Sequence, residues 1–378
     1  MTNRRFNHVF FPPSQGTGGL KIIELTTTEI ADAAIREIVQ ISLSAAPFDL
    51  FVDQLLIPSD IWFRWVSPLG QIRETKTALS GLFGRFVARA YLTRYCQFRY
   101  FEPIRSDTQT LSSWPNFTVR RVDNGDLPDW IVTTAAGANS IAIAEAKGSH
   151  NTNGYGAPLA SAKSQVRRIE IMSGTTTLAI KRYAIVSRWS VQGNPNLDMP
   201  WLAVDDPEEG ERPPNSNERK LLARSIALGH FAAMAEGLGA TAISNALQLA
   251  KKARPGSLQL PRQELIQVER EDAHARTVLG AAITSSGIIP LPRDGDLEEF
   301  RSALQTVYGD KVMLLTIDVE TLKKIDAGEF PIEGEQLAPP VGEPSFWEEE
   351  RQHSDETNLI PIRLATLSRP PPADQIES

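Results

Sequence analysis

The chain has 378 residues, of which 41% are hydrophobic and 22% charged, a composition typical of a soluble globular protein with room for two or three domains. Its single cysteine, Cys96, excludes an intrachain disulfide and a zinc site built from cysteines. The sequence contains no apolar run of about 18 residues and no signal-peptide pattern. We therefore expect a cytoplasmic protein without a membrane partner.

Charge is distributed unevenly along the chain. The formal net charge is −7, and residues 331–378, with ten acids and three bases, account for all of it. In the remaining 330 residues, acids and bases balance at 36 each, but basic residues gather in two groups, at 85–105 and 163–188. Each basic residue alone is expected to be an ordinary solvated side chain. Together, however, the two groups flank the acidic residues Asp129 and Glu145, and this arrangement favours the binding of a polyanion.

Residues 1–69 are expected to form an N-terminal arm and a helical region. Thr26 to Glu29 precede a stretch of periodic apolar residues, which predicts a capped helix start. Trp62, Phe63 and Trp65 follow, and their aromatic rings are compatible with stacking on bases or with packing in a core. Packing is the commoner role.

Residues 70–190 are predicted to form an α/β core. Apolar residues at three- and four-residue steps indicate a first helix. The predicted elements are a helix at 71–95, strands at 98–104 and 117–122, a two-stranded hairpin at 129–147, a helix at 159–172 and a strand at 177–187. This order, in which strands lie between two helices and another strand follows the second helix, indicates an α/β sandwich.

The hairpin at 129–147 is the stretch around which this core is organised. If its turn is the three-residue loop at 137–139, Asp129 falls opposite Lys147 and diagonal to Glu145. Two carboxylates and one ammonium then meet at one end of the hairpin. This combination suits a divalent metal ion beside a phosphate.

Pro128-Asp129 followed by Glu145-Ala146-Lys147 resembles the motif of the PD-(D/E)XK nuclease superfamily. Gln165 stands where many members carry a glutamine on the helix after the third strand. The resemblance implies a restriction-endonuclease-like core, a central mixed β-sheet flanked by helices, over residues 70–190. Additional N- and C-terminal α/β elements would surround it.

The resemblance also implies the roles of the motif residues. Asp129 and Glu145 would bind Mg²⁺, or Mn²⁺ in its place, and Ala146 would add its backbone carbonyl. Lys147 would position or deprotonate the attacking water, or neutralise charge on the phosphate. Gln165 would orient the water or the lysine. Whether one or two metal ions bind stays open.

One position departs from the family pattern. Many relatives place a glutamate of the metal shell on the helix before the core sheet, and the corresponding position just after Gly84 is Arg85. The nearest acid on that helix is Glu74, almost three turns away. The third carboxylate is therefore either absent or supplied from elsewhere in the chain.

The function that the resemblance implies is a metal-dependent DNA endonuclease of bacterial restriction or anti-phage defence. Its substrate would be double-stranded DNA, and a homodimer is expected because two strands need two sites. Lys163, Arg167 and Arg168 are the predicted DNA contacts. Since the chain has no ATPase motif, an ATPase or other defence protein is a candidate partner for the α/β region at 191–330. Residues 331–378, acidic and rich in proline, are expected to be an extended or disordered tail.

Other hypotheses remain open. The chain is alternatively a catalytically weak or inactive member of this fold, which binds DNA or serves as a subunit of a larger complex. A third hypothesis is an interaction module that uses the acidic tail. His150 is either a proton donor or DNA contact, or simply a surface histidine. If the motif has only a structural role, Asp129 would cap the start of a strand, and Glu145 and Lys147 would form an exposed ion pair that contributes little to stability.

Overall fold

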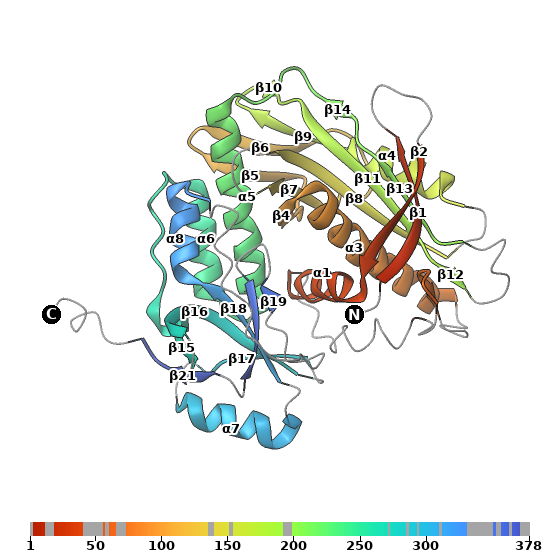
Figure 1. Ribbon diagram of the computed structural model, residues 1–378. Helices are drawn as coiled ribbons and strands as arrows, with labels where there is room; N and C mark the ends of the chain where they lie inside the picture. The colour runs from red at the N-terminus through yellow and green to blue at the C-terminus, as the bar shows by residue number, and fades with distance from the viewer. Residues whose placement is uncertain are drawn as a thin grey trace. The chain divides into compact units, whose positions relative to one another are not determined.

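The computed structural model describes residues 3–11, 19–40, 56, 60–65, 73–134, 140–150, 154–191, 199–270, 273–284, 287–292, 295–309, 312–330, 351–352, 357–362 and 365–370. The chain forms two compact units, one made of Met1–Glu37 with Phe48–Ala227 and the other of Ile38–Pro47 with Leu228–Ser378. Figure 1 labels the elements of both units. Helices and mixed or antiparallel sheets occur in each, which confirms the α/β class.

A mixed sheet forms the centre of the first unit. Its strand order is β2-β1-β13-β11-β8-β7-β4, and the short strand β14 pairs with β11 in addition. Strand β8 is parallel to β11 and antiparallel to β7. The strands are β1 (Asn3–Phe11), β2 (Gly19–Thr26), β4 (Phe98–Pro103), β7 (Trp130–Thr134), β8 (Ile141–Ser149), β11 (Ile180–Arg188), β13 (Trp201–Asp205) and β14 (Glu208–Glu209).

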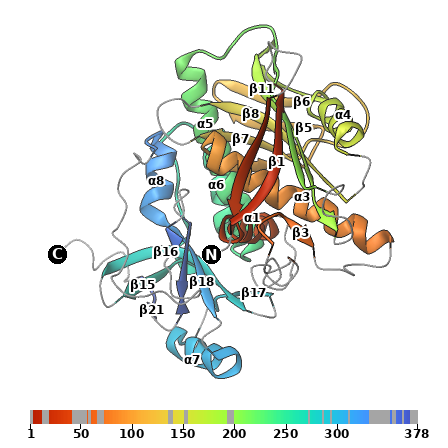
Figure 2. The ribbon, with the colours of Figure 1, turned by 45° about the vertical axis from the view of Figure 1, so that its right-hand side comes forward.

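Strand β8 is buried on both faces over its first six residues. Its small residues, such as Ala144 and Gly148, point to one face, and Glu145 and Lys147 point to the other, because side chains alternate along a strand. Helix α3 (Arg73–Cys96) packs on the small-residue face, where Gly84 contacts Gly148. Figures 1 and 2 show α3 running across this sheet.

The opposite face of β8 and β11 carries helix α4 (Gly156–Val166). The predicted helix at 159–172 is too long, because α4 ends at Val166 and β9 begins at Ile169. From there Ile169 and Ile171 are buried and alternate with less buried residues, which is the period of a strand. Gln165 remains on the helix, as predicted.

A second sheet of the first unit corrects another prediction. The strand expected at 117–122 is present as β6, but it does not join the main sheet. It pairs with β5 and β9, and its residues Phe117 and Val119 are buried while Arg120 on its other face is exposed. This sheet has the order β10-β9-β6-β5, with β5 (Thr108–Ser113), β6 (Asn116–Arg121), β9 (Ile169–Ser173) and β10 (Thr176–Thr177).

Helix α1 (Thr27–Gln40) begins with the predicted cap. The Glu29 amide donates to Thr26 Oγ1 at 3.0 Å, and the Thr26 amide donates to Glu29 Oε2 at 2.7 Å. This reciprocal pair satisfies two amides at the helix start. Nearby, the short strands β3 (Arg64–Trp65) and β12 (Ser190–Val191) pair in parallel.

The second unit contains a sheet of its own. Its strand order is β19-β20-β18-β16-β15-β21, with β17 paired to β16. The strands are β15 (Ile266–Arg270), β16 (Ala273–Thr284), β17 (Gly287–Pro290), β18 (Met313–Asp318), β19 (Arg351–Gln352), β20 (Thr357–Pro361) and β21 (Thr366–Ser368). The last three come from the segment expected to be an extended or disordered tail, and β20 pairs with the buried strand β18.

Two long helices follow one another along the chain. They are α5 (Ser216–Gly237) and α6 (Thr241–Lys252), and the turn between them contains Gly239, whose φ is +80°. The chain passes from the first unit to the second within α5. In the second unit, helix α7 (Leu297–Tyr308) is capped by Asp296 and α8 (Val319–Ala327) by Asp318. Among the described helices, none has the length and apolar character that crossing a membrane requires.

The contact between α3 and β8 predicts a specific sensitivity to added volume. A Cβ at Gly84 would lie 2.3 Å from the Gly148 nitrogen. We expect Gly84→Ala to lower the free energy of unfolding by roughly 1–3 kcal/mol, because backbone atoms cannot yield as a flexible side chain can.

Gly81→Ala is the matched control on the same helix, since nothing lies within 4 Å of its added Cβ. This variant is expected to be neutral or more stable by up to about 1 kcal/mol. Denaturant unfolding followed by circular dichroism measures both. Equal stability of the two variants would contradict a backbone-to-backbone contact at Gly84.

Candidate active site

The structure brings Asp129 and Glu145 together at one end of the hairpin. Asp129 directly precedes β7, and the pairing of Trp130 with Ala144 places it beside Glu145. Its amide donates to Glu145 Oε2 at 3.1 Å, and its Oδ2 accepts from the Ala146 amide at 2.8 Å. The predicted register, with Asp129 opposite Lys147, is therefore wrong by two residues. The turn at 137–139 on which that prediction rested lies outside the described residues.

Lys147 and Gln165 extend this pair into a chain of contacts. Lys147 Nζ lies 2.6 Å from Glu145 Oε1 and donates to Gln165 Oε1 at 2.7 Å. Gln165 Nε2 in turn donates to the Leu127 carbonyl at 2.6 Å, just upstream of Asp129. The amide thus holds both the lysine and the loop that leads to Asp129. Gln165 is positioned to fix the lysine, one of the two roles predicted for it.

Arg85, at the position where the resemblance expects a glutamate, occupies the other side of Asp129. Its Nη1 is paired with Asp129 Oδ1. Its Nε donates to Glu37 Oε1 at 2.6 Å, and its Nη2 pairs with the same oxygen. The guanidinium also lies over the ring of Trp130, 4.7 Å from the centroid. One cation therefore links two carboxylates from distant parts of the chain.

Glu37 of α1 is the residue that the sequence predictions missed. Its side chain is fully buried and its Oε2 contacts Arg89 Nη1 and Trp130 Nε1, both at 3.1 Å. A signal was present in the sequence, because Ile30, Ala34 and Ile38 form a buried stripe at helical spacing and Glu37 falls within it. An acid inside an apolar stripe needs a buried cation as a partner.

Burial and mutual repulsion perturb the carboxyl groups. Burial first, and then the negative charge of Asp129, raises the pKa of Glu145 to about 8, although Lys147 opposes the shift. Burial also raises the pKa of Asp129 against the opposing charge of Arg85. For Arg85, burial opposes the charged form, but Glu37 and Asp129 outweigh it and raise its pKa. A cation that binds beside such carboxyl groups stabilises their ionised form.

The side-chain oxygens of the site are of the chemical type that binds Mg²⁺. Asp129 and Glu145 offer hard carboxylate oxygens, the ligands that Mg²⁺ prefers. Two of their oxygens accept backbone amides, and the other two, Asp129 Oδ1 and Glu145 Oε1, face the cations of Arg85 and Lys147. A metal ion would have to replace cationic contacts at these two oxygens. No group of three or more His, Cys, Asp or Glu side chains able to hold a metal occurs among the described residues.

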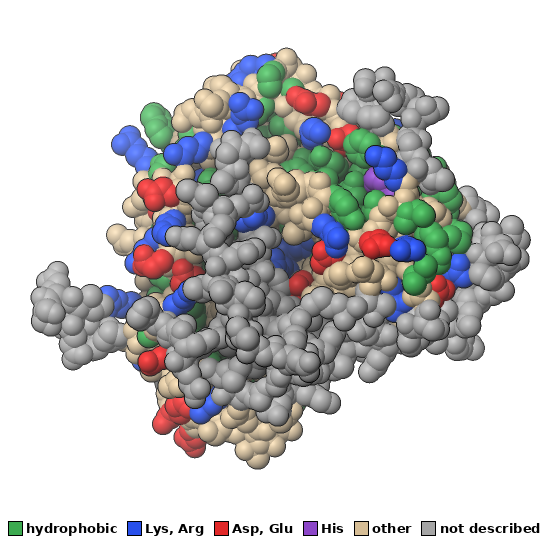
Figure 3. Space-filling view, viewed as in Figure 1, with side chains coloured by type: hydrophobic (Ala, Val, Ile, Leu, Met, Phe, Trp, Pro, Cys, Tyr) green, Lys and Arg blue, Asp and Glu red, His purple; other side chains and the backbone are tan. Residues whose placement is uncertain are grey.

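The three predicted DNA contacts separate in the structure. Lys163 and Arg167 line a hollow of about 550 Å³ beside α4, together with Asp123 and Ser164. Arg168 instead donates to the Asp126 carbonyl at 3.0 Å. Lys163 lies 3.2 Å from an oxygen of Asp205, and Arg167 Nη2 lies 2.6 Å from an oxygen of Glu209. On the face shown in Figure 3, basic and acidic side chains of the described residues are likewise interspersed.

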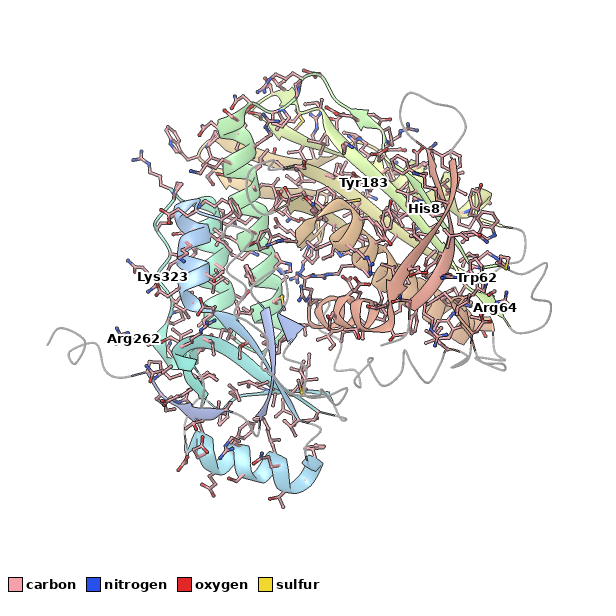
Figure 4. The ribbon with its side chains drawn as sticks, viewed as in Figure 1. His8, Trp62, Arg64, Tyr183, Arg262 and Lys323 are labelled. Atoms are coloured by element: carbon pink, nitrogen blue, oxygen red, sulfur yellow. The ribbon has the colours of Figure 1, made fainter. Side chains whose placement is uncertain are left out.

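The aromatic candidates divide between core and surface. Phe63 and Trp65 are buried, and Trp65 packs against Phe83 of α3. Trp62 is half-buried beside Arg64 in the segment that ends in β3, as Figure 4 shows. The packing role is therefore confirmed for Phe63 and Trp65. His150 stacks against Trp189 with the ring centroids 6.2 Å apart.

Comparison of the chain with protein-family models, with curated proteins and with solved structures finds no match.

The raised pKa of Glu145 predicts how stability depends on pH in the metal-free protein. An unfolded chain releases the proton of this carboxyl near pH 4.5, and the folded chain keeps it up to about pH 8. The folded state therefore binds more protons in this window, and the Glu145 contribution to the free energy of unfolding falls as the pH rises.

Glu145→Gln removes this contribution, so the stability difference between wild type and variant should shift in favour of the variant from pH 5 to pH 8. Denaturant unfolding in the presence of a chelator measures it. A difference that stays constant across this range would show that the carboxyl titrates normally.

Proposed function

We propose that the chain is a Mg²⁺-dependent nuclease that hydrolyses phosphodiester bonds of DNA. One observation carries the proposal: Asp129, Glu145, Lys147 and Gln165, the four residues of the resemblance, form one chain of contacts. They come from the loop before β7, from β8 and from α4. Chance occurrences of Pro-Asp and Glu-X-Lys would not be expected to converge with a glutamine in this way.

The order of the surrounding elements supports the same proposal. Helix α3, strands β4, β7 and β8, helix α4 and strand β11 follow one another in the order that the sequence pattern predicted for the core, although β6, which was expected among these strands, lies with β5, β9 and β10 in a second sheet. Helices α3 and α4 lie on opposite faces of the mixed sheet. The finer fold assignment is part of the proposal.

The residues of the site have distinct roles in this mechanism. Asp129 and Glu145 would hold Mg²⁺, which supplies stabilisation of the charge that develops on the phosphate. Lys147 pairs with Glu145 and would place a positive charge beside a bound phosphate, and Gln165 would fix the direction of the lysine. Since burial excludes water, these charges act more strongly than they would at the surface.

The hollow beside α4 is the proposed track for the DNA backbone. Lys163 and Arg167 are partly exposed there, with side chains 38% and 50% accessible, so each can exchange its carboxylate partner for a phosphate at little cost. Arg168 is left out of this surface, because the Asp126 carbonyl and the loop at Gly125 already hold it. The DNA contacts are thereby reduced from three residues to two.

A second candidate function rests on the pairing of Arg85 with Asp129. An ion pair at this position neutralises one of the two proposed metal ligands in the way a metal ion would. The chain would then be an inactive member of the fold that binds DNA or serves in a larger complex. Metal-dependent cleavage separates the two functions.

The proposed setting is restriction or anti-phage defence, with a homodimer cutting both DNA strands and an ATPase or another defence protein as a partner. These partners follow from the resemblance and from the absence of an ATPase motif.

Lys147→Ala is expected to reduce metal-dependent cleavage by about 100-fold or more, because it removes a charge that the transition state needs. Lys181→Ala is the matched control. Lys181 of β11 lies 3.0 Å from Asp206 and points to the face of the sheet opposite to Lys147. Both proteins are incubated with supercoiled plasmid, single-stranded DNA and RNA in Mg²⁺, Mn²⁺ or chelator. Equal cleavage by wild type and Lys147→Ala, or cleavage in chelator, would contradict the proposed site.

Lys163→Gln with Arg167→Gln is expected to weaken DNA binding and to reduce the slope of log K against log salt by about 2, near 0.9 per lost phosphate contact. Arg120→Gln with Lys323→Gln is the control, since these residues pair with Glu170 and Glu320 and neither lines the hollow. Binding is followed by fluorescence anisotropy over a range of salt concentrations. An unchanged slope in the first variant would place the DNA elsewhere.

A further inference from the structure

Arg85 has two separable sets of contacts. Its Nε and Nη2 hold Glu37 Oε1, while only its Nη1 reaches Asp129 Oδ1. A small rotation of the guanidinium can therefore release Asp129 and keep Glu37. Arginine presents donors on several edges of a rigid plane, which allows this division of contacts.

Arg85 is also prevented from leaving the site. Gly84, the preceding residue, lies against the backbone of Gly148, which fixes this turn of α3 on β8. Glu37 is held in place by Arg89 and by the indole N–H of Trp130. The Arg85 charge therefore stays near the carboxylates whether or not it contacts Asp129.

The charges of the site balance without a metal ion. Once all three carboxyl groups are ionised, Glu37, Asp129 and Glu145 carry three negative charges and face three cations, Arg85, Arg89 and Lys147. A divalent cation added to this set leaves a buried excess of two positive charges, which is costly in a low-dielectric environment. An anionic phosphodiester bound beside the metal ion would reduce this excess.

We propose that Arg85 makes metal binding at Asp129 and Glu145 depend on a nucleic-acid phosphate, with Glu37 holding the guanidinium once Asp129 is released. In the free protein Arg85 competes with the metal ion for Asp129. With DNA bound, the phosphate supplies negative charge, and metal and DNA bind cooperatively. This inference rests on the proposed function, because it takes Asp129 and Glu145 as the metal ligands.

The test is calorimetric titration of Mn²⁺ into the full chain, with and without a mixed-sequence DNA duplex whose phosphorothioate linkages resist cleavage. Wild type is expected to bind Mn²⁺ at least tenfold more tightly with the duplex than without it. Arg85→Gln is expected to bind Mn²⁺ without DNA at least tenfold more tightly than wild type does, and to show a smaller effect of the duplex.

Two further variants control for fold and charge. Arg94→Gln removes the same charge from the same helix, but its partner is Glu29, and it should behave as wild type. Arg85→Gln alone removes one of the two cations that pair with Glu37. The double variant Glu37→Gln with Arg85→Gln removes the Glu37 charge as well, and it should bind Mn²⁺ as tightly as Arg85→Gln does. Circular dichroism checks that each protein is folded.

The inference is overturned if folded Arg85→Gln and the double variant bind Mn²⁺ no more tightly than wild type does, or if the duplex leaves wild-type affinity unchanged. The nuclease proposal fails separately. If the variants gain affinity and the duplex strengthens wild-type binding, while wild type cleaves no nucleic acid in either metal, the competition stands and the catalytic function falls.

Discussion

The backbone contact between Gly84 and Gly148 is the constraint on which the candidate site depends. With a side chain at either position α3 could not lie so close to β8. Because Arg85 follows Gly84 and Lys147 precedes Gly148, this contact brings an arginine and the motif lysine to the same end of the sheet. Asp129 then receives a guanidinium from one side, and Glu145 receives an ammonium from the other. The geometry of the site is thus a consequence of close packing between a helix and a strand.

Cationic and N–H partners explain why these carboxyl groups can be buried. Glu37 and Glu145 have almost no exposed surface, and each is stabilised by a cation and an N–H donor. Removing one partner from such a set would leave an uncompensated buried charge, which costs several kcal/mol. Arg85 stands where the resemblance expects a glutamate, and the third acid at the site, Glu37 of α1, pairs with Arg85. Two metal ligands are proposed for this chain, and the positive charge around them is greater than it would be with a glutamate in place of Arg85.

The sequence predicted the parts of the fold that depend on local pattern. The predicted hairpin corresponds to β7 and β8, and helical periodicity identified α3. Its failures are long-range. Glu37 reaches the site through contacts with residues about 50 to 90 positions away, β6 joins another sheet, and β20 comes from a segment whose composition indicated disorder. Propensity and spacing carry no information on such partners, which only tertiary packing selects.

The central claim is that Asp129 and Glu145 are a metal site whose ligand Asp129 is shared with Arg85. Crystals of the protein with the uncleavable DNA duplex and Mn²⁺ test it most directly, through anomalous scattering at the manganese edge. The account predicts a manganese peak that contacts oxygens of both carboxylates, with Arg85 paired to Glu37 alone. A peak elsewhere, or full DNA occupancy with Arg85 still on Asp129 and no manganese between the carboxylates, would contradict it.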